Sequence, residues 1–206
     1  MENTREQILY LLKRDGPMTA EKLAEGLQIT SMGVRQHLSL LEKDGLVAHQ
    51  IERKKMGRPG YYFSLTAAGD DFFPRTYAQM ANHILDTVRQ LEGEKGIDKI
   101  FRRRLEILEK QYRSRMKQPD LAGRIAELAA IRTEEGYMAD WKKEGANTYL
   151  LRELNCAICQ IAQQCIQACN YELKLFQKVL PDTEITREEH IVKGDRMCTY
   201  IIRKKK

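Results

Sequence analysis

No apolar run in this sequence approaches the roughly 20 residues that a membrane-spanning helix requires. The first residues, MENTREQILYLL, place acidic side chains where a signal peptide would carry basic ones followed by an apolar stretch. The sequence also has no paired general acid and base, no phosphate-cradling glycine loop and no His/Glu spacing of a metalloprotease. We therefore expect a cytoplasmic protein that has no membrane partner and is not an enzyme.

Cysteine is missing from the chain until residue 156, and all five cysteines follow after that point. Disulfides are rare in the cytoplasm, so these thiols are expected to be free, redox-active or metal-bound. The 206 residues are 42% hydrophobic and 31% charged, which fits one or two small domains. The net charge of +6 suits an anionic partner, and it suits a solvated basic surface equally well.

The N-terminal part of the chain predicts three short helices. Thr4 is expected to cap the first, which ends near residue 15, and Thr19 to cap the second. Thr30 caps the third, in which Val34 and Leu38 begin an apolar stripe at helical spacing. The opposite face of the third helix carries side chains that suit the major groove of DNA: Ser31, Met32, Arg35, Gln36 and Ser39. Arginine and glutamine can bond guanine and adenine edges, serine can bond base or phosphate, and methionine can contact a thymine methyl.

A basic hairpin follows the third helix. Residues 46–52 and 61–65 alternate as two antiparallel strands would. The segment between them is cationic, with Arg53, Lys54, Lys55 and Arg58. Such a tip neutralises phosphates, and it can place an arginine in the minor groove, which we expect of Arg58. Helices and hairpin together predict a winged helix-turn-helix domain over residues 1–66.

The third helix and the run GRPGYYFSLTAAGDDFFPRTY resemble winged helix-turn-helix regulators that carry a GRP…Y.LT..G…FP..Y pattern. This pattern is typical of the SufR-type repressors of iron–sulfur cluster biogenesis and their relatives. The resemblance covers about the first third of the chain. It implies a transcriptional regulator, a repressor, that binds a double-stranded DNA operator.

Apolar stripes after Thr66 predict three more helices, near residues 77–91, 101–116 and 121–136, with a break at residues 93–96. These stripes are either core or dimer surface. Two readers about one helical turn apart bind a two-fold site far better than one reader does, so we expect a homodimer. Residues 67–136 are accordingly predicted to form a helical dimerisation region.

The last third predicts two hairpins around a helical stretch. Residues 137–142 and 148–154 form the first hairpin, and residues 184–192 and 197–203 form the second. Residues 156–180 between them have a helical pattern. The expected unit is a small α/β sensor module of order ββαββ over residues 137–206. The fold class of the whole chain is therefore α+β.

The cysteines all lie in this module: Cys156, Cys159, Cys165, Cys169 and Cys198. Cysteines can be small core residues, but their restriction to one module favours a metal or redox role. On an unbroken helix, Cys156 and Cys169 would lie about 19 Å apart at about 1.5 Å per residue, too far for one cluster to touch both. Either the helix breaks near residues 164–166, or only some cysteines are ligands. The spacing differs from that of a zinc ribbon, so an iron–sulfur cluster fits better.

The resemblance to the SufR-type regulators continues here. The pair Asn155-Cys156, a cysteine thirteen residues on at Cys169, and GDRMCTY around Cys198 resemble their cluster-binding region. The resemblance implies that these three cysteines are metal ligands. The family has a further cysteine near the place of Thr183 here, so the full ligand set and the cluster type stay open. Additional candidate donors are Cys159, Cys165 and His190.

We therefore predict a DNA-binding repressor whose operator affinity is controlled by a cysteine-ligated iron–sulfur cluster. The alternative is a winged-helix regulator that senses a small organic ligand, or oxidants through free thiols. The ending GDRMCTYII supports the organic ligand, because it resembles ligand-binding domains of the vinyl-reductase type. A third possibility is a scaffold for cluster assembly that does not bind DNA.

Overall fold

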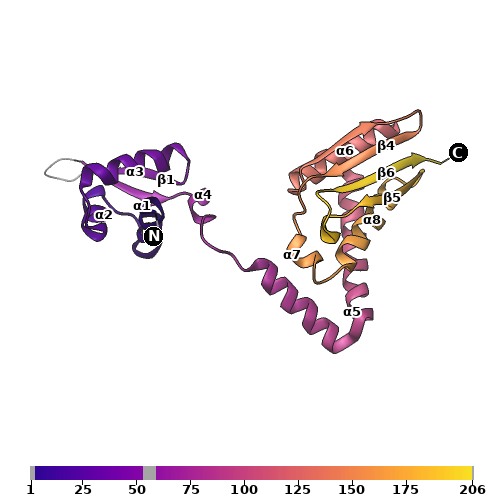
Figure 1. The fold of residues 1–206 in the computed structure, drawn as a ribbon, viewed down its shortest axis with the longest axis horizontal. Coiled ribbons are helices and arrows are strands. Elements are labelled where there is room, and N and C mark those ends of the chain that lie inside the picture. The colour runs from indigo at the N-terminus through magenta and orange to yellow at the C-terminus, as the bar shows by residue number, and fades with distance from the viewer. Residues whose placement is uncertain (1–2, 53–58, 206) are drawn as a thin grey trace. The chain divides into compact units, whose positions relative to one another are not determined.

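The computed structural model describes residues 3–52 and 59–205 of the chain. The chain divides into two compact units, Met1–Arg75 and Thr76–Lys206 (Figure 1). Within the described ranges, no helix combines the length and the apolar character needed to cross a membrane. The α+β fold class predicted from the sequence is confirmed.

The first unit begins with three helices, as the sequence predicts: α1 (Thr4–Asp15), α2 (Ala20–Leu27) and α3 (Ser31–Lys43). Thr19 and Thr30 cap α2 and α3, because each side chain accepts a hydrogen bond from a backbone N–H of the first turn. The expected cap of α1 is wrong by one residue. Asn3 holds that position, and its side chain accepts a hydrogen bond from the Arg5 backbone N–H at 3.3 Å.

A hairpin and a short helix complete the first unit. Strands β1 (Val47–Glu52) and β2 (Gly60–Leu65) pair antiparallel, with Val47 opposite Leu65 and Glu52 opposite Gly60. Helix α4 (Ala67–Asp70) follows at once. The buried core of this unit is contributed by all three long helices and both strands: Ile8, Leu9, Leu12, Ala20, Leu23, Ala24, Val34, Leu38, Leu41, Val47 and Phe63.

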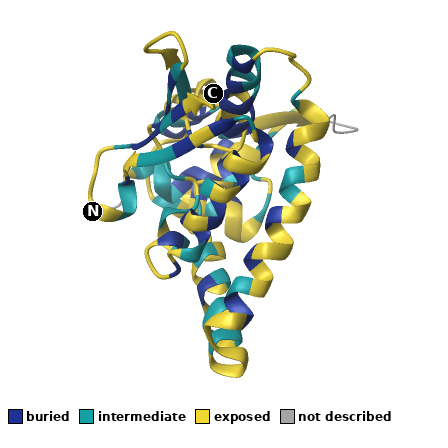
Figure 2. Ribbon diagram, turned by 90° about the vertical axis from the view of Figure 1, so that its right-hand side faces the viewer, coloured by how far each residue is buried: buried dark blue, intermediate teal, exposed yellow. Residues whose placement is uncertain are grey.

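The second unit starts with a long bent helix, α5 (Tyr77–Arg115), followed by α6 (Leu121–Glu134). Gly93 has φ +68° and interrupts the helical backbone of α5, so the break predicted at residues 93–96 is confirmed. We call the part of α5 before Gly93 its first arm and the part after it its second arm. The bend lies at the lower end of the molecule in Figure 2, where exposed residues prevail.

The rest of the second unit is a four-stranded antiparallel sheet with two helices inserted. Its strands are β3 (Ala139–Lys143), β4 (Thr148–Glu153), β5 (Thr183–Glu189) and β6 (Cys198–Lys204), in the order β3-β4-β6-β5. Helices α7 (Cys159–Ala162) and α8 (Gln167–Val179) separate the two hairpins. The order of elements is therefore the predicted ββαββ, with a short 3-10 turn, Ile191–Lys193, before β6.

The helices of residues 67–136 are shared between the two units. Helix α4 packs with β2 in the first unit, whereas α6 and the second arm of α5 bury their apolar stripes in the same core as the sheet and α8. Phe101 of α5 stacks on Tyr171 of α8 with ring centroids 5.9 Å apart. The division between the units falls after Arg75, and the buried stripes of α6 and of the second arm of α5 have their partners within the second unit.

Candidate functional site

Helix α3 separates a buried face from an exposed one. Val34, Leu38 and Leu41 are buried against the rest of the first unit. Every side chain that the sequence proposes as a DNA reader is exposed on the other face: Ser31, Met32, Arg35, Gln36 and Ser39. Met32 keeps 67% of its surface exposed, which is unusual for a large apolar side chain and leaves it free to contact a ligand.

Arg35 is held by a partner that the sequence analysis missed. Its Nη2 lies 2.6 Å from Oε1 of Glu21 on α2, and both side chains are exposed. The pKa of the Glu21 carboxyl is lowered by a backbone hydrogen bond within Glu21 and by the hydrogen bond from Arg35, so the carboxylate stays charged. A fixed negative charge therefore stands beside the main basic side chain of the α3 surface.

A hollow of about 230 Å³ lies where α3 meets the hairpin. Its lining includes Arg35 and Ser39 from α3 and His49 and Tyr61 from the strands. The His49 ring is 5.3 Å from the Tyr61 ring, and its Nδ1 is 2.5 Å from Oε1 of Glu42. The two strand residues belong to the candidate interface, although alternation alone did not single them out.

The cationic hairpin tip falls on Arg53, Lys54, Lys55 and Arg58, which lie outside the residues that the structure describes. Their predicted contacts with phosphate and with the minor groove stay predictions. The described parts of the hairpin bring Glu52 and Gly60 opposite each other, directly before and after this segment.

The helical stretch with four cysteines breaks between α7 and α8, at residues 163–166, as one of the two alternatives from the sequence requires. Cys156 follows β4, Cys169 lies in the first turn of α8, and Cys198 begins β6 beside Glu153 of β4. A charge on Cys156 or Cys198 raises the pKa of the Cys169 thiol, and a charge on Cys198 does the same to Cys156. The break thus brings the three predicted ligand cysteines into one electrostatic neighbourhood.

Burial dominates the ionisation of these thiols. It raises the pKa of Cys156 to about 11 and that of Cys169 to about 12, and it also raises the pKa of Cys198. The backbone N–H of Ile191 donates to Sγ of Cys198 at 3.4 Å, and a hydrogen bond from the Ile158 backbone opposes the rise at Cys156. At neutral pH these side chains are therefore neutral thiols, and backbone N–H groups donate to two of them, Cys156 and Cys198.

Arg187 supplies positive charge beside two of the three thiols, Cys169 and Cys198. Its Nη2 donates to the Cys169 carbonyl at 2.5 Å, and its Cζ lies 5.2 Å from the centre of the Tyr200 ring. Its Nε is buried and has no hydrogen-bond partner within the described chain. An unsatisfied N–H of a buried guanidinium is suited to an anionic group that is added to the site.

The other candidate donors are placed less favourably. Cys165 is buried next to Gln167, and its pKa is raised by burial while Arg89 of α5 opposes this. His190 is buried near Arg187, and burial followed by the charge of Arg187 lowers its pKa, so the ring is neutral. Cys159 opens α7 and is close enough for its charge to affect Cys156.

Thr183, where the resembling family has a further cysteine, lies at the wrong end of the sheet to reach the three thiols. It pairs with Lys204, whereas Cys198 is at the opposite end of β6. Six residues of strand at about 3.3 Å each separate these ends by about 20 Å. A fourth ligand at position 183 would therefore be out of reach of Cys198.

The donor set fits an iron–sulfur cluster better than a single ion. Over residues 3–52 and 59–205, no group of three or more His, Cys, Asp or Glu side chains is arranged to hold one metal ion. Zinc requires thiolates at about 2.3 Å from one centre. Thiols that affect one another's pKa, a backbone N–H that donates to sulfur and a guanidinium with a spare N–H are groups of the kind that hold an anionic iron–sulfur cluster.

The segment that carries Cys156 contacts the first arm of α5. Nδ2 of Asn82 donates to the Gln160 carbonyl at 3.1 Å, and Asn82 is buried. Cys156, Cys159 and Ala78 line one hollow of about 260 Å³. A change at Cys156 therefore reaches the helix that directly follows the N-terminal unit in the chain.

A buried ionic network lies beside the cysteines. Arg132 of α6 is 1% exposed, and its guanidinium contacts the carboxylates of Glu153 at 2.6 Å and Glu172 at 2.9 Å. The Tyr137 hydroxyl also donates to Glu172, at 2.5 Å. Glu153 pairs with Cys198 across the sheet, and Glu172 follows Cys169 by three residues, so this network fixes two of the three cysteine-bearing elements.

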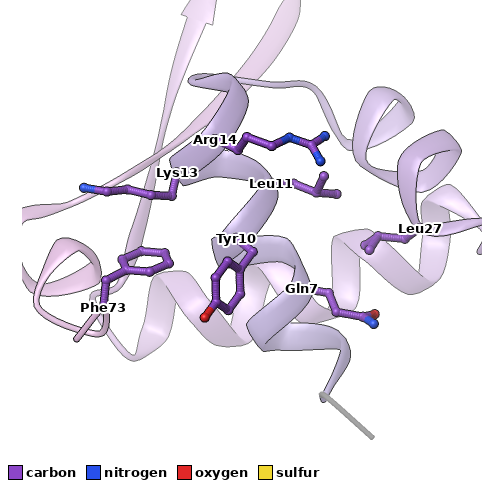
Figure 3. A pocket seen from close by; sticks show the side chains of 7 residues that line it. All are labelled: Gln7, Tyr10, Leu11, Lys13, Arg14, Leu27 and Phe73. Atoms are coloured by element: carbon purple, nitrogen blue, oxygen red, sulfur yellow. The ribbon is translucent and has the colours of Figure 1, made fainter.

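A further hollow, of about 420 Å³, lies on α1 in the first unit (Figure 3). Tyr10 meets Phe73 edge to face at 5.3 Å, and Nζ of Lys13 lies 5.4 Å from the Phe73 ring and 2.8 Å from Asp70. These contacts fix the segment after α4 onto α1. The polar groups of Lys13 are thereby engaged within the unit, so we assign the hollow no ligand.

Thiol alkylation tests the ionisation state described above. In cluster-free, reduced protein at pH 7.5, Cys156 should react with iodoacetamide about a hundredfold and Cys169 about a thousandfold more slowly than a free thiol, because thiolate falls about tenfold per unit of raised pKa. The rates should climb about tenfold per pH unit between pH 8 and 10. Mass spectrometry of cysteine peptides measures each site. Rapid alkylation of Cys169 at neutral pH would favour a free-thiol sensor instead.

Comparisons with known proteins address the first unit. A family model described as an HTH domain matches residues 4–62, and no curated protein matches the chain. A solved structure of a MarR family regulator from Neisseria meningitidis shares 22% identity and a TM-score of 0.31, over 54% of this chain and 78% of that one. PadR of Bacillus subtilis in complex with operator DNA shares 15% identity and a TM-score of 0.31, over 65% and 92%. With the fold described above, the family match shows that the first unit of this chain is a helix-turn-helix domain with a hairpin wing.

Proposed function

We propose that this protein is a transcriptional repressor that binds a double-stranded DNA operator as a homodimer. The observation that carries the proposal is the exposed face of α3, on which Ser31, Met32, Arg35, Gln36 and Ser39 are all accessible. A helix with such a face can enter the major groove, where Arg35 can bond a guanine and Gln36 an adenine. The cations of residues 53–58 and the overall charge of +6 add attraction to phosphate.

The pairing of Arg35 with Glu21 gives a sharp test. Replacing Arg35 by alanine should cost about 1–3 kcal/mol at one base position and relax specificity there. Replacing Glu21 by glutamine should have the opposite sign and tighten DNA binding several-fold, because it releases Arg35 and removes a negative charge near phosphate. Selection of binding sites from random DNA, followed by fluorescence anisotropy, measures both effects.

The Lys54→Ala variant is the matched control for the Arg35 experiment. It should weaken binding to all sequences alike and lower the salt dependence, since a phosphate contact carries no sequence information. Binding that is unchanged in both the Arg35→Ala and the Lys54→Ala variants would contradict the DNA-binding proposal.

We also propose that an iron–sulfur cluster on Cys156, Cys169 and Cys198 controls DNA affinity. When bound, the cluster supplies thiolate–iron bonds and a redox-active centre. The chain's own residues then join three elements at one point, namely the end of β4, the start of α8 and the start of β6. Arg187 offsets the added negative charge, and the Cys156 segment passes the change to α5 through Asn82 and Gln160.

Protein purified without oxygen tests the cluster. We expect visible absorption, matched iron and sulfide content, and a change in operator affinity of at least about tenfold on cluster loss, which needs about 1.4 kcal/mol of coupling. The Cys169→Ser variant should abolish all three, whereas Cys165→Ser should keep them because Cys165 lies against Gln167 and the Arg89 side of α5. If the protein is colourless and its DNA affinity is unchanged by cluster reconstitution, the cluster does not regulate DNA binding.

The raised pKa values of Cys156 and Cys169 disfavour these two thiols as sensors of oxidants. Oxidation proceeds through the thiolate, which is scarce at neutral pH for thiols with pKa values of about 11 and about 12. Metal ions, in contrast, can displace the protons as they bind.

A further inference from the structure

The first arm of α5 has an exposed apolar stripe in addition to its buried face. Met80, Ile84 and Leu91 are 64%, 52% and 79% exposed, and the half-buried Val88 lies between the last two. The spacing of four, four and three residues places these side chains in one row along the helix. We call this row the outer stripe. Apolar rows at this helical spacing are typical of helices that pack against another helix.

An apolar groove of about 250 Å³ adjoins the outer stripe. The two arms of α5 form its walls, and the segment around α7 and α8 forms its floor. Its lining is almost entirely hydrocarbon and includes Ile84, Leu85, Ile100, Phe101, Ile158 and Ala168. Ile84 belongs to both the stripe and the groove, so the two form one continuous apolar surface.

The charges around the outer stripe favour a second copy of the chain as its partner. Between residues 76 and 91 only Asp86 and Arg89 are charged, and they form an ion pair of 2.6 Å with each other. Two such arms can approach each other without like-charge repulsion. The outer stripe itself offers a nucleic acid or an acidic protein no net positive charge, and the adjoining groove contributes a single cation, Arg104.

We infer that the first arm of α5 is the homodimer interface, with the outer stripe of one protomer packed along the stripe and groove of its partner about a two-fold axis. This inference rests on the homodimer of the proposed function and names the surface that forms it. A two-fold contact uses the same patch on both protomers, which a continuous stripe and groove on one helix allows.

The floor of the groove gives this interface a link to the cysteines. Ile158 and Ile161 lie on the segment between Cys156 and Cys165, and Ala168 precedes Cys169. Side chains that line the dimer contact are thus within two residues of two proposed ligands. Gain or loss of the cluster would reshape the surface on which the partner packs, and it would thereby alter the pairing of the two DNA-reading units.

Sedimentation of the full-length protein tests the interface. We expect a wild-type dimer, and we expect Ile84→Glu and Leu91→Glu to weaken dimerisation at least about a hundredfold, since each buries an unpaired carboxylate in the contact. The Leu91→Ala variant should weaken it more mildly, and Gln90→Glu, on the same arm but outside the stripe, should leave it unchanged. Circular dichroism checks that each variant stays folded; the substituted side chains are exposed in the protomer.

A monomeric wild type, or glutamate variants that dimerise as well as the wild type, would overturn the inference. A different outcome would contradict the proposed function. If the glutamate variants dissociate but the wild-type dimer binds no DNA sequence, the interface stands and the regulator proposal falls. If the variants are monomeric and retain weak, sequence-specific binding to one half-site, both stand.

Discussion

Replacing Arg132 by methionine is expected to lower the free energy of unfolding of the second unit by about 3–5 kcal/mol. The change leaves the carboxylates of Glu153 and Glu172, 2% and 4% exposed, without the cation that neutralises them. It also removes the guanidinium whose Cζ lies 3.4 Å from the centre of the Tyr137 ring. Methionine fills much of the volume, so the loss measures mainly the uncompensated charge.

The sign of the pH dependence follows from the same burial. Burial already raises the pKa of Glu153, and removal of Arg132 takes away the main charge that opposes this rise. A carboxyl whose folded pKa lies above its unfolded value favours the folded state most at low pH, and this advantage is lost as pH rises through the folded pKa. The Arg132→Met variant should therefore be less impaired at pH 5 than at pH 8.

Urea unfolding at both pH values, followed by the fluorescence of Trp141 in the second unit, measures the effect. Arg152→Met is the control, because Arg152 pairs with Asp140 on the neighbouring strand through two hydrogen bonds that are only half-buried, so its loss should matter less. Equal losses of unfolding free energy in the two variants would show that the buried network stabilises the protein no more than the Arg152–Asp140 pair does.

Replacing Gly69 by alanine is expected to destabilise the first unit by about 3 kcal/mol, near the upper end for overpacking. A Cβ at this position would stand 2.0 Å from the Leu46 carbonyl oxygen, which is backbone and cannot rotate away. Relief would require α4 to move off the turn between α3 and β1. Thr66 would then lose its hydrogen bonds from N–H to the Leu46 carbonyl and from Oγ1 to the Gly45 carbonyl.

Gly26→Ala is the matched control for Gly69→Ala. Its Cβ would meet only the tip of Leu11, at 3.3 Å, a flexible side chain that can shift. Alanine is also the better residue within a helix such as α2, so the control should be neutral or stabilising. Thermal unfolding and operator binding of both variants decide the matter. A Gly69→Ala variant as stable as the Gly26→Ala control would refute the close approach.

Local signals were sufficient to predict the first unit. Caps at Thr19 and Thr30, the stripe that begins at Val34 and Leu38, and a turn-rich basic segment between two strands each specify structure within a few residues. The cap of α1 was misassigned because asparagine and threonine are adjacent and both suit the position. The pairing of Arg35 with Glu21 could not be foreseen, because it joins two helices through a tertiary contact.

The packing of the second unit could not be predicted from local sequence patterns. An apolar stripe shows that a helix face is covered, but not whether the partner lies in the same chain or in another. Leu105 and Leu128 are buried within the unit, whereas Ile84 and Leu91, on the first arm of α5, are exposed. The buried position of Arg132 could not be predicted from the sequence. A single arginine within an amphipathic helix is usually solvated, and its carboxylate partners are 21 and 40 residues away.

The order of the sheet has a consequence for how copies of this chain can associate. Its two outer strands, β3 and β5, present unpaired backbone that could in principle recruit a strand from another molecule. Lys142 and Lys143 are exposed on β3, while β5 carries exposed Glu184 and an irregular register near Arg187. Pairing of two β3 edges would bring lysines together, and a strand added at β5 would meet a distorted ladder, so each border carries a feature that opposes strand addition.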